Sequence, residues 1–91
     1  MTFKMTWALA AEHVDEWTGQ DFTEAAAVLE REVGATVSAS GMNEGGQMHF
    51  RETFLAPVRD GIPGAGREAV EAGRSWDQAA GPLLVVLAPA A

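Results

Sequence analysis

The stretch TFKMTWALAAEH, residues 2–13, alternates between apolar side chains and mostly small or polar ones. One side of this alternation carries Phe3, Met5, Trp7, Leu9 and Ala11. Successive side chains of a β-strand point to opposite faces of the sheet, so a period of two predicts a strand with one buried face. The remaining elements can be placed outward from this strand.

A helix is predicted to follow the strand. Residues 13–20, HVDEWTGQ, break the alternation with charged residues, so we expect them to form a loop. Asp21 is followed three residues later by Glu24, which is the spacing of a capping box at a helix start. Apolar residues then recur at helical spacing, and Gly34 is the natural end of the helix. The apolar stripe comprises Phe22, Ala25, Ala26, Leu29 and Val33.

The second half of the chain predicts two strands, a loop, a helix and a last strand. Residues 35–42 and 47–56 both alternate around the turn-forming sequence MNEGGQ, so we expect a β-hairpin. Residues 57–66 contain two prolines and three glycines and predict a loop. Residues 67–80 predict a helix along Ala69, Gly73, Trp76 and Ala80, and the apolar run at residues 83–88 predicts a strand.

The resulting order, β-α-β-β-α-β, is that of the α+β ferredoxin-like sandwich, formed as one domain over residues 1–91. Its antiparallel sheet has the strand order 4-1-3-2, with both helices on one face. The other face would then be open, and a last strand apolar on both sides would need a cover. We therefore expect a homo-oligomer.

Composition limits the classes of partner and cofactor. The net charge is −7 and the pI is about 4.5, which disfavours nucleic acid and anionic membranes and leaves a basic or neutral protein partner. The absence of cysteine excludes disulfides and common zinc sites. No signal peptide or membrane span is evident, so we expect a cytoplasmic protein. An alanine- and glycine-rich chain with Lys4 as its only lysine is typical of bacterial or bacteriophage proteins.

The candidate catalytic residues are Glu12, His49 and Arg51. In the predicted sheet Glu12 lies near His49, so the two side chains could act as a carboxylate and a base, with Arg51 binding an anionic group. The alternative without a catalytic role is a solvent-exposed sheet face whose charged side chains pair across strands. The candidate ligand-binding residues, lining a cavity between sheet and helices, are Trp7, Phe50 and Trp76.

Two other clusters are weaker candidates. Glu12, His13, Asp15 and Glu16 match no established metal spacing, even with His49 added, so no metal site is assigned. The glycines before Arg67 precede a helix start but lack the Lys-Ser/Thr of a phosphate-binding loop. No cofactor is expected.

Three functions remain open. The composition favours a non-catalytic binding or assembly module that self-associates through its sheet. The first alternative is a cofactor-independent enzyme of the dimeric α+β barrel type, with the candidate residues above. The second is an inhibitor or immunity-type protein that binds a basic partner through an acidic face. That face would comprise Asp15, Glu16, Glu24, Glu30 and Glu32.

Overall fold

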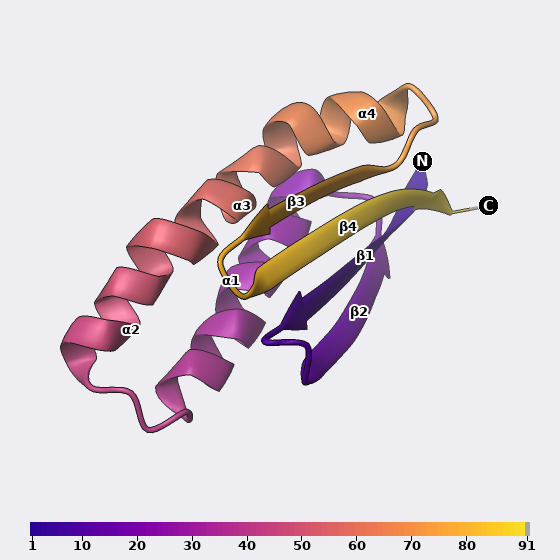
Figure 1. Cartoon of the computed structure of the whole chain (residues 1–91). Coiled ribbons are helices and arrows are strands. Elements are labelled where there is room, and N and C mark those ends of the chain that lie inside the picture. Colours follow the sequence, from indigo (N-terminus) through magenta and orange to yellow (C-terminus); the bar gives the residue numbers. More distant parts are fainter. Residues whose placement is uncertain (91) are drawn as a thin grey trace.

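In the computed structural model, which describes residues 1–90, one β-hairpin precedes the helical region in the sequence and another follows it (Figure 1). The first hairpin consists of β1 (Thr2–Leu9) and β2 (His13–Gly19), and the second of β3 (Trp76–Ala80) and β4 (Leu83–Ala90). Between them lie α1 (Phe22–Ser38), α2 (Glu44–Phe50), η1 (Arg51–Leu55), α3 (Ala56–Gly61), η2 (Ile62–Gly66) and α4 (Arg67–Glu71), where η denotes a π-helical turn.

The four strands form one antiparallel sheet in the order β2-β1-β4-β3. The two hairpins join along β1 and β4, where Thr2 pairs with Ala90 and Leu9 pairs with Leu83. The strands that begin and end the chain are therefore both central, and the last strand is not at an edge.

The α+β class and the four-stranded antiparallel sheet agree with the sequence-based prediction, but the ferredoxin-like order β-α-β-β-α-β is not found. The first error lies at residues 13–19, which were expected to form a loop and instead form β2. This strand is at an edge, and most of its side chains are exposed. Trp17 is the one large apolar side chain of this strand that packs against the core, so β2 has no apolar alternation and backbone pairing with β1 defines it.

Helix α1 begins where the capping box predicts and continues beyond the expected end. The carboxylate of Asp21 accepts hydrogen bonds from the backbone N–H groups of Thr23 and Glu24, at 2.8 and 3.1 Å. Gly34 has helical geometry, and the helix runs on to Ser38. Residues 35–38 are thus helical and not part of a strand, because Val37 continues the buried stripe.

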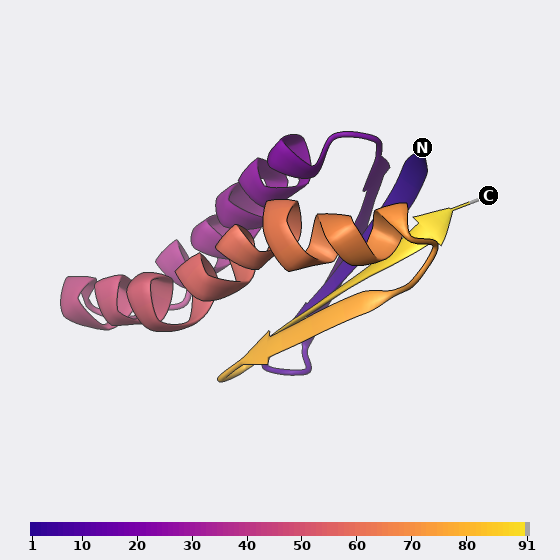
Figure 2. The same cartoon turned by 90° about the horizontal axis from the view of Figure 1, so that it is seen from above.

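The segments predicted as a strand (residues 47–56) and a loop (residues 57–66) belong to one long, curved helical stretch, from α2 to α4 (Figures 1 and 2). A proline removes a backbone hydrogen bond and clashes with the carbonyl four residues earlier. The wide turns adjoin these positions: Pro57 follows η1, and Pro63 lies in η2. Packing of this stretch against the core compensates for the backbone hydrogen bonds lost at the prolines. Its buried residues are Phe50, Leu55, Val58, Ile62, Gly66 and Val70.

The helix predicted over residues 67–80 ends at Glu71. Gly73 adopts a positive φ of 78°, and the chain turns back into β3. Trp76 therefore belongs to a strand and packs near Gly61 and Gly66. A left-handed glycine ends the helix here for the same reason that glycine caps many helices.

One core lies between the sheet and the helices. The inward face of β1 and β4 is buried, and Figure 2 shows the helices on that side. The Phe3 ring stacks on Phe22 with centroids 4.1 Å apart. The buried sheet residues are Phe3, Met5, Trp7, Leu9, Leu83, Val85 and Leu87. Within residues 1–90, none of the helices has both the length and the hydrophobicity to cross a bilayer.

An ion-pair network also joins α1 to the second helical stretch, which runs from α2 to α4. The Arg59 guanidinium lies 3.1 Å from a Glu30 oxygen on α1 and 3.0 Å from an Asp60 oxygen. Hydrogen bonding to Asp60, followed by the charges of Asp60 and Glu30, raises the pKa of Arg59 against the opposing effect of burial.

Candidate functional site

The three candidate catalytic residues are not on the sheet together. Glu12 lies in the turn between β1 and β2, whereas His49 is in α2 and Arg51 is in η1. His49 packs edge-on against Phe54, with its Nδ1 3.4 Å from the Thr53 hydroxyl. Among residues 1–90, no hydrogen bond or ion pair joins Glu12 to His49. The predicted sheet register is wrong because residues 47–56 are helical.

Arg51 is engaged by α1. Its Nη2 donates to the Gly34 carbonyl at 3.2 Å and to the Ser38 hydroxyl at 3.0 Å. These contacts give the guanidinium a structural role between two helices, in place of the open sheet position from which it was expected to bind an anion.

The three aromatic candidates belong to different parts of the molecule. Trp7 and Phe50 are each 6% exposed and lie in the core. Phe50 lines a groove beside the end of α1, Trp7 lines the hollow next to that groove, and Trp76 covers two glycines of the second helical stretch. The dimeric-barrel alternative requires these three side chains to line one cavity, and the structure places them apart.

The acidic cluster after β1 is spread over both faces of β2. Glu16 lies on the same face as Lys4 and forms an ion pair with it at 2.8 Å, whereas His13 and Asp15 pair with Leu9 and Trp7 on the other face. No group of three or more metal-ligating side chains is arranged for a metal ion in the part of the chain that the structure describes.

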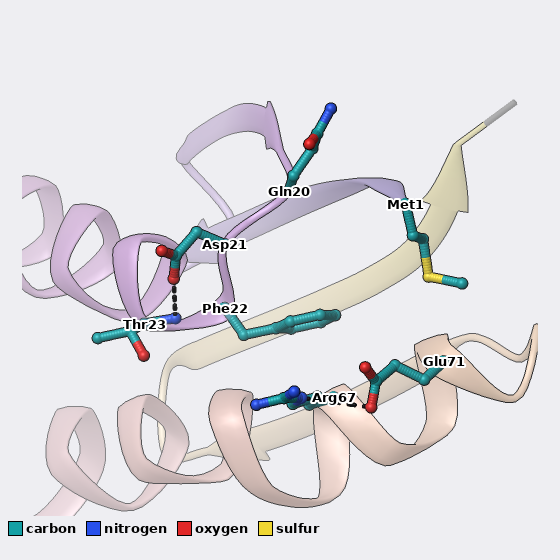
Figure 3. A pocket seen from close by; sticks show the side chains of 7 residues that line it. All are labelled: Met1, Gln20, Asp21, Phe22, Thr23, Arg67 and Glu71. Carbon is teal, nitrogen blue, oxygen red and sulfur yellow. Dashed lines mark hydrogen bonds and ion pairs between the residues drawn. The ribbon is translucent and has the colours of Figure 1, made fainter.

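The glycine-rich segment before Arg67 is helical, and Arg67 contributes to a polar hollow near the start of α1 (Figure 3). Its volume is about 570 Å³. The Arg67 Nε lies 3.3 Å from a Glu71 oxygen, and Asp21 already caps the first turn of α1. Both features that would attract an anion are thus occupied by carboxylates of the chain.

An apolar groove lies where α1 extends past the end of the sheet. It has a volume of about 470 Å³ and is bounded by the first hairpin turn, the end of α1 and the loop that follows. Phe50 lies in its wall, and Met42 is 40% exposed. The other lining residues are Leu9, Ala10, Glu12, His13, Thr36, Val37, Ala39, Ser40 and Pro82.

A second, polar hollow of about 280 Å³ adjoins this groove and shares Glu12, His13 and Thr36 with it. Asp15 and Glu32 add two more carboxylates. An apolar hollow thus continues into an acidic one across Glu12 in the first hairpin turn, His13 at the start of β2 and Thr36 in α1.

The open face of the sheet carries an apolar row across all four strands. Strand pairing places Val14 beside Ala8, Ala8 beside Leu84, and Leu84 beside Ala79. Val14 is 64% exposed and Leu84 is 42% exposed. We call these four residues the apolar row. Sequence reasoning missed it because β2 was not recognised, although Val14, Trp17 and Thr18 are good strand formers.

Comparison with known proteins finds no family model, no curated protein and no solved structure that matches this chain. Its function must therefore be inferred from the surfaces and side chains described above.

Proposed function

We propose that the protein is a small acidic binding and assembly module that pairs with a second copy of itself through the open face of its sheet. The apolar row carries this proposal. Four neighbouring strands each contribute an apolar side chain, and the two largest are exposed. Burying such a row against its own copy removes apolar surface from water in a closed, symmetric pair.

The distribution of charge favours a second copy as the occupant. A chain with a net charge of −7 repels its own copies. The charged residues of the open face are Lys4, Glu16 and Asp77, and the first two neutralise each other. Self-repulsion is therefore weaker across this face than across the helices, where acidic residues outnumber the arginines. The acidic residues are Glu24, Glu30, Glu32, Glu44, Glu52, Asp60, Glu68 and Glu71, and the arginines are Arg31, Arg51, Arg59 and Arg67.

Pairing through the sheet leaves the acidic helices accessible for another protein. Such a surface attracts basic partners over a distance and repels nucleic acid and anionic lipid. The proposed module therefore combines an apolar interface for self-association with an acidic surface for a partner.

The solution mass, measured by light scattering at about 100 µM, tests the proposal, because an interface with a micromolar Kd is occupied at that concentration. We expect a dimer, stabilised by added salt as the self-repulsion is screened. Leu84→Glu places a charge in the apolar row and should give a folded monomer.

Met48→Glu is the matched control, because Met48 is an exposed apolar residue on α2, at 60% exposure. This variant should remain dimeric. A monomeric parent protein, or a Leu84→Glu variant as dimeric as the parent, would overturn the proposal.

A further inference from the structure

A second surface, which meets the apolar row only at Val14, has the properties of a peptide-binding site. The apolar groove and the acidic hollow beside it form a continuous depression with Glu12, His13 and Thr36 in common. One end presents Phe50, Val37 and other apolar side chains, and the opposite end presents carboxylates.

The carboxylates at the acidic end are available to a ligand. Glu12 and Asp15 take part in no ion pair within residues 1–90, and Glu32 is paired with its neighbour Arg31 at 3.5 Å, where both side chains are largely exposed. Neither hollow is lined by a lysine or an arginine. A cation bound there would therefore meet the negative charges of Glu12 and Asp15, which no ion pair within residues 1–90 compensates.

The backbone at the boundary between the two hollows is held in an uncommon conformation. Ala10 and Ala11 have φ angles of 55° and 58°, in the left-handed region that costs residues with a Cβ about 1–2 kcal/mol each. The Ala10 N–H donates to the Pro82 carbonyl at 2.9 Å, which ties this turn to the start of β4. The Glu12 N–H also donates to the Leu9 carbonyl at 3.2 Å and closes the turn between β1 and β2, so this wall of the depression has a fixed backbone.

We propose that this depression binds a segment of another protein in which an apolar side chain is adjacent to lysine or arginine. The apolar side chain would enter the groove beside Phe50, and the cation would lie near Glu12 and Asp15. Charge complementarity selects this occupant. Nucleic acid and anionic lipid would bring negative charge to the carboxylates, and a second copy of this acidic chain offers few cations.

Three acetylated, amidated tetrapeptides test the proposal: Leu-Phe-Lys-Lys, Leu-Phe-Glu-Glu and Ser-Ser-Lys-Lys. Titration into ¹⁵N-labelled protein should show binding of the first, with a Kd of about 0.1–1 mM because the contact is small. The shifted amides should be those of residues 10–13 and 36–42. The second and third peptides should bind at least about fivefold more weakly, since the second lacks the cationic side chains and the third lacks the apolar ones.

Variants distinguish this site from general attraction to an acidic protein. Glu12→Gln combined with Asp15→Asn should weaken binding of Leu-Phe-Lys-Lys about fivefold at low salt. Ala39→Leu should obstruct the groove and weaken binding similarly. The control Glu68→Gln combined with Glu71→Gln removes the same amount of charge from α4 and should leave the affinity unchanged.

Several results would overturn the proposal. They are equal binding of the lysine and glutamate peptides, amide shifts centred on the apolar row, and equal weakening by the control variant. Concentration-dependent shifts of residues 10–13 and 36–42 without peptide would show that a second copy occupies the groove instead. Since the apolar row is unchanged in these variants, the solution mass reports on self-association separately.

Discussion

The guanidinium of Arg51 lies directly beside Gly34 on the neighbouring helix and donates to its carbonyl oxygen at 3.2 Å. A Cβ at Gly34 would lie in ordinary contact with the guanidinium, so only a side chain larger than a methyl group would displace it. Ser38, one turn later, contributes a second acceptor at 3.0 Å. Contacts between the helices thus support α1 beyond a glycine at which it was expected to end.

Gly34→Ala should stabilise the protein by about 1 kcal/mol, because alanine is the better helix former and the φ of Gly34 is not in the left-handed region. An added Cβ would lie 3.5 Å from the Arg51 nitrogens, which is ordinary contact. Urea denaturation measures the change. Gly34→Leu should reverse the gain by displacing the guanidinium, and a Leu variant as stable as the Ala variant would contradict this account.

Arg51→Met should lower the free energy of unfolding by about 1 kcal/mol, because it removes hydrogen bonds from a charged donor to two acceptors on α1. Thermal unfolding followed by circular dichroism measures the loss. The control is Arg31→Met on the exposed side of α1, where the change should be close to zero. Equal effects of the two substitutions would refute the bridging role of Arg51.

Asp21→Ala should cost about 1 kcal/mol, because the carboxylate caps two N–H groups in the first turn of α1. Asp21→Asn retains an acceptor oxygen and should recover most of the stability. Chemical denaturation of both variants provides the comparison. An Asn variant as unstable as the Ala variant would show that the negative charge, acting on the helix dipole, provides most of the effect.

Ala10→Gly and Ala11→Gly should each stabilise the protein by about 0.5–1 kcal/mol, since glycine relieves the left-handed conformation at some entropic cost. Differential scanning calorimetry gives the shift in Tm. Ala80→Gly, in the regular strand β3 and outside the apolar row, is the control and should destabilise. Loss of stability at residues 10 and 11 would count against this turn geometry.

Gly66→Ala should destabilise the protein by about 1–3 kcal/mol through overpacking. A Cβ at this position would lie 2.8 Å from Leu87 Cδ1 and 3.2 Å from the Gly61 carbonyl oxygen. Gly64→Ala is the matched control in the same turn, where a Cβ has no neighbour within 4 Å, and it should be neutral or stabilising. Urea denaturation should separate the two variants clearly.

Sequence reasoning predicted elements whose buried face is regular and uninterrupted. The alternation around Met5 and Trp7 predicted β1, Asp21 marked the start of α1, and the run at residues 83–88 predicted β4. Prediction failed where an element is mostly exposed, as in β2, or where the pattern is interrupted. In the second helical stretch, the π-turns shift the helical register, and two prolines resemble loop signals.

The candidate sites were likewise predicted only in part. Glu12 was identified as a candidate and lies at the depression described above, but the strand expected to hold His49 is a helix. The apolar row could not be predicted without β2, because its members are separated along the chain and become neighbours only through strand pairing.

The amino-acid sequence by itself determined the acidic charge, the absence of cysteine chemistry, the α+β class and the strands at both ends of the chain. These properties follow from composition or from local periodicity. Tertiary structure alone decided the strand order, the helical state of residues 47–66, and the surfaces formed by the groove and the apolar row. Packing against a distant sheet can outweigh local preferences of about 1 kcal/mol per residue, since each buried side chain contributes more than that.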